Sequence, residues 1–299
     1  MALLQVNLLS ETLMRTVPVQ VILPVDKITL PGMAPREEKP YKTLYLLHGI
    51  FGNYTDWVTG TAIARWAEEK DLAVVMPSGD NMFYIDQPDS HNYYGEFIGC
   101  ELVELTRKMF PLSRQREDTF IGGLSMGGFG ALRNGLKYAQ TFSRIIGLSS
   151  ALIADELELR TDDTPFFIES RSYAQTVFGN LSEAVHSDKN PGWLAGEVAR
   201  LVGGPEGQAR AADVPGELPE IYLACGREDS LLEKNIKMRD KLIDFGYKVT
   251  YEDAPGGHDW DFWNRQIKRA LDWLPLGNGE EGIHSGNVRI LEDHPGRNV

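Results

Sequence analysis

The chain alternates between short apolar runs and longer stretches whose apolar residues recur at helical spacing. The apolar runs, each the length of a buried strand, lie at 43–49, 72–79, 118–125, 144–152, 220–226 and 248–254. The amphipathic stretches lie at 61–70, 93–110, 126–142, 231–246 and 259–274. Strands that alternate with helices in this way predict a mostly parallel central sheet with helices on both of its faces.

Four segments depart from this alternation. Residues 3–10 and 16–24 alternate polar and apolar positions, which predicts an antiparallel pair of strands at the edge of the sheet. Residues 155–216 have a mixed pattern with short helices, and we interpret them as a helical insertion over the carboxyl edge of the sheet. A single domain is therefore expected over residues 1–276. Residues 277–299 are polar and glycine-rich, and predict a tail with at most one short strand.

Charge and composition narrow the class of protein. The formal net charge is −13, which disfavours binding to nucleic acid and to anionic membranes. No apolar run approaches the roughly 18 residues of a membrane span, and the first residues lack a basic region followed by an apolar one. We therefore expect a cytoplasmic protein. Two cysteines, Cys100 and Cys225, are too few for a secreted disulfide framework, and the sequence has no Cys/His metal motif.

The segment Gly123-Leu124-Ser125-Met126-Gly127 matches the pattern G-x-S-x-G between a predicted strand and a predicted helix. The pattern alone is weak evidence, but this position is the one that a nucleophile elbow requires. Such an elbow holds the serine backbone in a strained turn, and glycines avoid collisions with the neighbouring strands. A glycine-rich phosphate loop is the alternative, but neither of its usual motifs occurs here. We therefore interpret Ser125 as the nucleophile.

A nucleophilic serine needs a base and an acid, which follow it along the chain in α/β-hydrolases. His258 is the one histidine that follows a strand-like run after Ser125 and directly precedes a helix. The strand at 220–226 ends near Glu228 and Asp229. Asp229 lies farther into the loop, so we favour it as the acid. Asp229 in this position is also typical of a helix N-cap.

The oxyanion that forms when a serine attacks a carbonyl group needs two backbone N–H donors. Met126, directly after the nucleophile, is one candidate, and the loop "LLHGIFGNYTDW" supplies the other. In that loop Ile50 is favoured and Phe51 is the second choice, while His48 is expected to be a structural hydrogen bonder. Three aromatic residues either line the substrate pocket or belong to the core: Phe51, Trp57 and Trp260.

Four segments together resemble the esterase D family, also called the putative-esterase family of α/β-hydrolases. They are "LLHGIFGNYTDW", "GGLSMGGFGALR", "CGRED" and "GGHDWDFW", and the resemblance covers roughly Leu3 to Leu274. The opening "SETLMRTVPVQVILP" is most similar to the bacterial tributyrin-esterase branch. The resemblance implies an α/β-hydrolase fold. It also implies roles for five residues: Ser125 as nucleophile, Asp229 as acid, His258 as base, and Ile50 and Met126 as oxyanion donors.

The family includes S-formylglutathione hydrolases, tributyrin esterases, and acetyl and feruloyl esterases. S-formylglutathione hydrolases tend to carry serine and cysteine where this chain has "HGIFGN", which favours oxygen esters here. We therefore expect a serine carboxylesterase acting on short-chain acyl esters, of the acetyl or butyryl type or on acetylated or feruloylated carbohydrate. The alternatives are a thioesterase or acyltransferase with the same triad, or a non-catalytic binding protein. Hydrolysis through an acyl-serine requires no metal or organic cofactor, so none is expected. The expected partner is a small-molecule ester, and homo-oligomerisation stays open.

Overall fold

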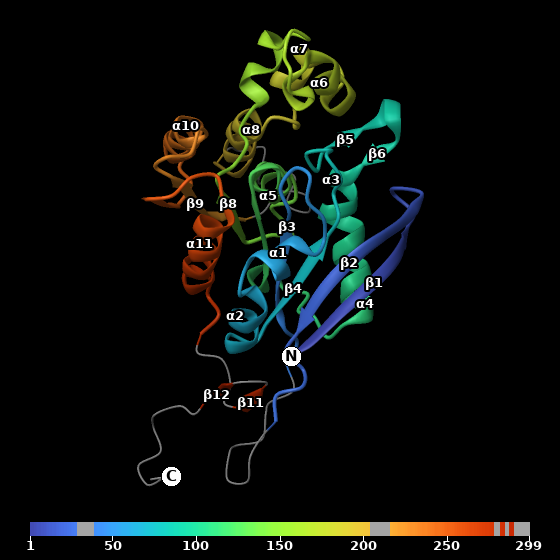
Figure 1. Cartoon of the computed structure of the whole chain (residues 1–299), viewed down its shortest axis with the longest axis vertical. Coiled ribbons are helices and arrows are strands. Elements are labelled where there is room, and N and C mark those ends of the chain that lie inside the picture. Colours follow the sequence, from blue (N-terminus) through green and yellow to red (C-terminus); the bar gives the residue numbers. More distant parts are fainter. Residues whose placement is uncertain (29–38, 204–215, 278–281, 285–286, 290–299) are drawn as a thin grey trace.

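The fold is built around one eight-stranded sheet, seen in Figure 1 with helices on both sides. The computed structural model describes residues 1–28, 39–203, 216–277, 282–284 and 287–289. The strands of the main sheet, in spatial order, are β1 (Ala2–Ser10), β2 (Arg15–Leu23), β4 (Leu72–Pro77), β3 (Lys42–Leu47), β7 (Thr119–Leu124), β8 (Arg144–Leu148), β9 (Glu220–Gly226) and β10 (Val249–Ala254). From β4 to β10 all neighbours run parallel. The predicted mostly parallel sheet is confirmed.

The first two strands form the predicted antiparallel pair, but the prediction that both lie at the edge of the sheet is wrong. β2 pairs antiparallel with both β1 and β4, so it lies inside the sheet and only β1 is at the border. The two short strands β5 (Asp86–Gln87) and β6 (Asn92–Tyr93) form a separate pair. They lie in the connection between β4 and the next helix, where the sequence pattern gave no strand signal.

The strand residues alternate between two helical layers. Leu44 and Leu46 of β3 belong to one buried cluster, whereas Tyr45 and Leu47 belong to the other. The first cluster is covered by α1 (Asp56–Gly60), α2 (Ile63–Glu69) and α11 (Trp260–Trp273). The second is covered by α4 (Leu102–Met109), α5 (Met126–Lys137), α8 (Pro191–Gly203) and α10 (Leu232–Asp244). The segment predicted as one helix at 93–110 contains α3 (Tyr94–Glu96), a π-helical turn (Phe97–Glu101) and α4.

The segment between β8 and β9 contains the predicted short helices. α6 (Arg171–Phe178) and α7 (Leu181–Val185) rise beyond the carboxyl ends of the strands in Figure 1. α8, in contrast, packs against α5 and α10 and is part of the helical layer. The segment therefore has two parts, and only α6, α7 and the turns before them lie over the carboxyl edge.

The C-terminal tail contains one more strand than expected. β11 (Gly282–His284) pairs antiparallel with β12 (Asn287–Arg289), where the sequence predicts at most one strand. The two strands lie at the end of the molecule far from α6 and α7 (Figure 1). None of the described helices combines the length and apolar composition that a membrane span requires.

Candidate active site

Ser125 sits in a strained turn between β7 and α5. Its backbone angles, φ 53° and ψ −117°, lie in a region that non-glycine residues rarely adopt. The turn is held by its own backbone bonds. The Ser125 N–H donates to the carbonyl of Leu148 at 2.9 Å, and the Ser125 carbonyl accepts from Ala151 at 2.9 Å. These bonds to the end of β8 fix the backbone of Ser125 at the carboxyl edge of the sheet.

The glycines on either side of Ser125 are required because backbone passes too close for a side chain. A Cβ at Gly123 would lie 2.3 Å from the carbonyl oxygen of Gly127. A Cβ at Gly127 would lie 2.3 Å from the carbonyl oxygen of Leu47, at the end of β3. Backbone atoms cannot swing aside as side-chain ends can, so both positions need glycine. The predicted steric reason for the G-x-S-x-G pattern therefore agrees with the packing.

Three predicted residues form one chain of hydrogen bonds. The Nε2 atom of His258 lies 2.9 Å from Oγ of Ser125, and its Nδ1 atom lies 2.8 Å from Oδ2 of Asp229. His258 lies in the loop between β10 and α11, and Asp229 in the loop after β9. The arrangement is that of a serine nucleophile, a histidine base and an orienting carboxylate.

The carboxylate of Asp229 is buried but well supplied with donors. Its side chain has no exposed surface. Burial by itself raises the pKa of Asp229, but hydrogen bonds from His258 and from the backbone N–H of Leu231, at 2.9 Å, outweigh it and lower the pKa below its usual value. Asp229 therefore stays ionised, and it fixes the histidine tautomer with the proton on Nδ1.

The other carboxylates near His258 in the sequence have different partners. Glu228 accepts a hydrogen bond from the backbone N–H of Gly256 at 2.6 Å. Asp253 pairs with Arg227 at 2.7 Å. Asp259 caps α11, because it accepts from the backbone N–H of Phe262 at 2.8 Å. Their engagement elsewhere supports the choice of Asp229 as the acid.

The loop after β3 brings a second backbone donor toward Ser125. A Cβ at Gly49 would lie only 3.5 Å from Cβ of Ser125. The N–H of Phe51 donates to the side chain of Asn81 at 2.8 Å, so it is already engaged. In the described part of the chain, the N–H groups of Ile50 and Met126 have no protein acceptor. Both residues line the cavity of Ser125. Because the N–H of Phe51 is engaged and that of Ile50 is not, Ile50 is favoured as the second donor.

His48 supports this loop. Its Nε2 accepts from the N–H of Gly79 at 2.9 Å, and its Nδ1 lies 2.6 Å from the carbonyl of Gly49. Its own carbonyl accepts from the Tyr84 hydroxyl at 3.0 Å. Burial lowers the pKa of His48, which favours the neutral ring that can accept at Nε2. His48 thus holds the loop that carries Ile50, in agreement with its expected structural role.

A cavity of about 700 Å³ opens at Ser125 and His258. Phe51 and Trp260 line it, as the sequence suggests. Trp57 does not: it is buried, its Nε1 donates to the carbonyl of Leu47 at 3.0 Å, and its ring packs edge-on against Trp260. Trp57 therefore belongs to the core and supports the wall from behind. Of the two alternatives that the sequence left open for Trp57, pocket wall or core, its position fits the core.

Several lining residues escape the sequence pattern. The Trp263 ring packs edge-to-face on the His258 ring, with centroids 4.9 Å apart. Its spacing of three from Trp260 on α11 places both on one helix face, a signal that could have found it. Phe166 and Ile168 come from the segment before α6. The sequence alone does not identify these two residues as part of the lining, because their segment has no periodicity that predicts its path.

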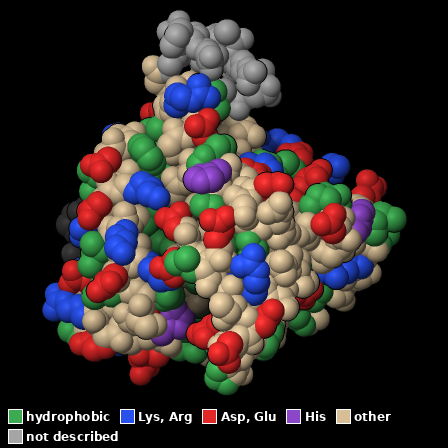
Figure 2. All heavy atoms as spheres, turned by 90° about the horizontal axis from the view of Figure 1, so that it is seen from above, with side chains coloured by type: hydrophobic (Ala, Val, Ile, Leu, Met, Phe, Trp, Pro, Cys, Tyr) green, Lys and Arg blue, Asp and Glu red, His purple; other side chains and the backbone are tan. Residues whose placement is uncertain are grey.

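Charge over this edge of the molecule is mixed. Figure 2 looks down on the face that carries α6 and α7, where acidic and basic side chains are interspersed. Phe51 and Phe166 are both exposed at the rim of the cavity, with ring centroids 6.2 Å apart. The site therefore combines an apolar mouth with a surface that has no single dominant sign of charge.

Comparison with known proteins identifies the class. A family model described as putative esterase matches residues 10–274. An acetyl esterase from Caldicellulosiruptor saccharolyticus is 43% identical over 274 residues, which cover 92% of this chain and 98% of the relative. Two solved structures from Staphylococcus aureus each cover 91% of this chain and 98% of their own. They are the fluorophosphonate-binding serine hydrolase FphF, with 32% identity and a TM-score of 0.73, and the S-formylglutathione hydrolase FrmB, with 31% and 0.72.

The chain belongs to the putative esterase family, and its fold is the α/β-hydrolase fold. It is a serine hydrolase that acts on carboxylic ester bonds. The predicted family, fold and carboxylesterase activity are confirmed.

Proposed function

We propose that Ser125, His258 and Asp229 are the catalytic triad of an esterase for short-chain acyl esters. The observation that carries this proposal is the hydrogen-bond chain through both nitrogens of His258, which opens onto the cavity. The relative named acetyl esterase supports acetyl groups as the acyl part. The apolar mouth formed by Phe51 and Phe166 suits a short aliphatic chain, so the proposal extends to butyryl and tributyrin-type esters.

Acylation uses the geometry directly. Oγ of Ser125 attacks the ester carbonyl carbon while its proton moves to Nε2 of His258. The carbonyl oxygen becomes an oxyanion, which we assign to the N–H groups of Ile50 and Met126. Met126 is the first residue of α5, so the positive end of the helix dipole adds to this stabilisation. Asp229 stabilises the imidazolium that forms.

The intermediate then collapses and the enzyme is restored. The bond from carbon to the alcohol oxygen breaks, and His258 delivers its proton to the departing alcohol. A water molecule then gives a proton to His258 and attacks the carbonyl carbon of the acyl-serine, which forms a second oxyanion. Collapse of that intermediate releases the carboxylic acid and returns the proton to Ser125.

Covalent labelling tests the assignment. A fluorophosphonate probe should modify Ser125, as located by peptide mass spectrometry, and the variant Ser125→Ala should take up no label. The same variant should lose nearly all turnover of p-nitrophenyl acetate. Unlabelled Ser125 in the folded wild type, or equal turnover by both proteins, would contradict the proposal.

A thioesterase is the second candidate, because the solved structure of FrmB is named an S-formylglutathione hydrolase. The loop "HGIFGN" and the relative named acetyl esterase favour oxygen esters instead. Comparing kcat/KM for S-formylglutathione and p-nitrophenyl acetate decides between them. We further propose a cytoplasmic location, one catalytic domain over residues 1–276 and a separate tail over residues 277–299.

A further inference from the structure

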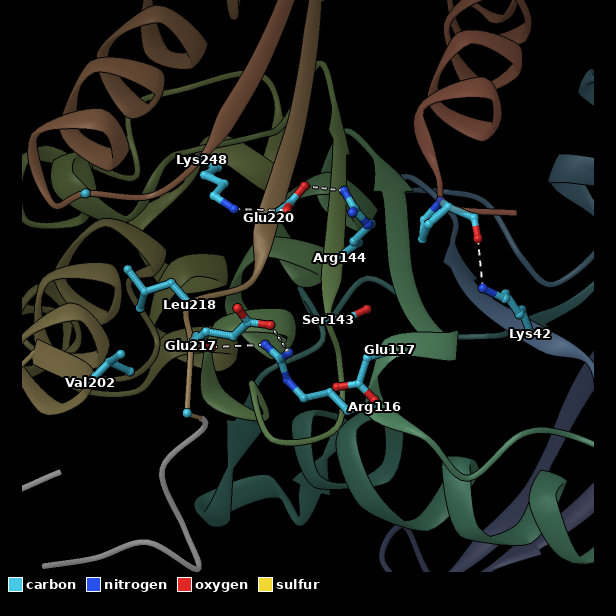
Figure 3. Close-up of a pocket in the computed structure, with 13 residues that line it drawn as sticks. Lys42, Arg116, Glu117, Ser143, Arg144, Val202, Glu217, Leu218, Glu220 and Lys248 are labelled. Carbon is cyan, nitrogen blue, oxygen red and sulfur yellow. Dashed lines mark hydrogen bonds and ion pairs between the residues drawn. The ribbon is translucent and has the colours of Figure 1, made fainter. Parts of the chain in front are cut away.

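Outside the catalytic cavity, one hollow lies at the opposite edge of the sheet, where β8 and β9 begin. Its volume is about 540 Å³. Figure 3 shows that its basic side chains face acidic ones: Arg116 lies 3.7 Å from Glu217, and Arg144 and Lys248 both pair with Glu220. These charges satisfy one another, so this hollow presents an ion-pair network.

A different hollow, of about 360 Å³, adjoins the catalytic cavity. It lies between α10, the start of α8 and the turn after β8. Glu156 and Lys234 line both cavities and form an ion pair with each other. The two cavities therefore meet at this pair, and a ligand long enough to reach beyond the pair from Ser125 would extend into the second cavity.

The second cavity has an excess of positive charge. Lys234, Lys237 and Lys241 recur at spacings of three and four on one face of α10. Lys234 pairs with Glu156, and Lys241 lies 3.3 Å from Asp155. Lys237 has no ion-pair partner among the described residues. Three cations against two anions give the lining a net charge of +1, in a chain whose net charge is −13.

Hydrogen bonds of a buried asparagine fix the part of the lining that carries Asp155. Asn190 is buried, and its amide donates to Asp155 at 2.7 Å and to the carbonyl of Val185 at 2.8 Å. Its side-chain oxygen accepts from the N–H of Gly192 at 2.9 Å. Burial raises the pKa of Asp155, but Asn190 and Lys241 outweigh it and lower the pKa. Asp155 is thus ionised and already engaged, which leaves Lys237 available to a ligand.

The apolar part of the lining is aliphatic. It consists of Leu152, Ala154, Pro191 and Met238. In the described lining there is no aromatic ring on which a sugar ring could stack, in contrast to the catalytic cavity with Trp260 and Trp263. This composition suits a flexible carbon chain with a charged end.

We propose that the second cavity binds the alcohol part of an extended ester whose far end carries a carboxylate. The ester group lies at Ser125, the chain passes the Glu156–Lys234 pair, and the carboxylate meets Lys237. This inference rests on the proposed function, because it requires Ser125 to act on the ester.

Two matched substrates test it: the acetyl ester of ω-hydroxyhexanoate and the acetyl ester of ω-hydroxyhexanamide, which differ in terminal charge. Wild type should have a kcat/KM about fivefold higher for the anionic ester, the effect of one favourable charge pair at a partly exposed site. The preference should shrink at about 0.5 M salt, because salt screens such pairs. Lys237→Gln should bring the ratio of the two values close to one, and Lys237→Glu should bring it below one.

Lys268→Gln is the matched control, because Lys268 lies on α11 and pairs with Asp272 at 3.2 Å. It should keep the wild-type ratio. Equal ratios in wild type and Lys237→Gln would overturn the second site, as would a wild-type preference for the neutral ester. Failure of the proposed function shows separately, as absence of p-nitrophenyl acetate turnover by the wild type.

Discussion

Asp229 and His258 come from the loops after two neighbouring parallel strands and meet through a hydrogen bond of 2.8 Å between Oδ2 and Nδ1. β9 and β10 pair so that Cys225 lies opposite Asp253, which brings the carboxyl ends of both strands level. Neighbouring strand ends can present an acid and a base to each other across one short gap. An acid and a base from the same loop could meet in this way only if that loop folded back on itself.

Replacing the acid by its amide should therefore be damaging. Asp229→Asn presents an N–H where a carboxylate is needed, which favours the wrong tautomer of His258; in a serine protease the equivalent change lowers kcat about 10⁴-fold. Because hydrolases vary in this dependence, we expect a loss of at least about a hundredfold in kcat for p-nitrophenyl acetate. Steady-state kinetics on folded protein measure it.

Two neighbouring aspartates provide controls for that change. Asp253→Asn loses an exposed ion pair with Arg227, and Asp259→Asn keeps a residue that caps helices well. Each should lower kcat by less than about tenfold. A crippling Asp253→Asn with an active Asp229→Asn would show that the acid is misassigned.

Much of this site follows from the sequence, because its parts obey local rules. A G-x-S-x-G pattern between a strand and a helix places Ser125, and chain order with strand ends places Asp229 and His258. The periodicity gives the strands and the main helices. Each of these features is marked by a short motif, by periodicity or by chain order, so it can be predicted from a single sequence.

The remainder depends on contacts between distant segments. Arg133 on α5 is fully buried, and it pairs with Asp86 at 3.0 Å and with Asp188 at 2.7 Å. The hydroxyl of Tyr173 on α6 donates to the carbonyl of Asn81 at 2.5 Å. These polar contacts hold the segment between β8 and β9 in place over the site. Hydrophobic periodicity does not predict them. Trp57 was ambiguous for the same reason, since only its bond to Leu47 reveals that it faces the core.

The phenylalanines at the cavity mouth should contribute to binding of the acyl or alcohol chain. Phe51→Ala removes apolar surface that a longer chain can cover, so kcat/KM should fall about fivefold more for p-nitrophenyl hexanoate than for p-nitrophenyl acetate. Leu9→Ala, which truncates an exposed apolar residue on β1, is the control and should not change that ratio. Equal losses on both esters would contradict a chain-binding role for Phe51.

Removing the tail should leave the chemistry intact. The described lining of the catalytic cavity comes from residues before Leu274, and β11 pairs with β12. A chain ending at Leu276 keeps the carbonyl of Pro275, which accepts from Lys42 at 2.8 Å. We expect kcat/KM for p-nitrophenyl acetate within about twofold of the full chain. A hundredfold loss in a protein with an unchanged melting temperature would show that the tail takes part in the site.

His48 should make the free energy of unfolding depend on pH. Burial lowers its pKa in the folded protein below the usual 6.5, so the unfolded chain takes up the proton first as the pH falls. Stability should be fully present above about pH 6.5 and should decline below it, by at most about 1.4 kcal/mol per pH unit, until the pH passes the lowered pKa. Asp229 also has a lowered pKa, but its contribution is lost only as the pH falls below its ordinary value of 3.8.

Urea unfolding at about pH 7.5, 6.5, 5.5 and 5 measures this effect. The variant His48→Gln retains an acceptor for the N–H of Gly79 but cannot take up a proton, so it should be less stable at pH 7.5 and lose the decline that His48 causes. His186→Gln, which changes an exposed histidine, should keep the wild-type pH dependence. If His48→Gln and wild type show the same decline below pH 6.5, the neutral His48 is not what couples protonation to folding.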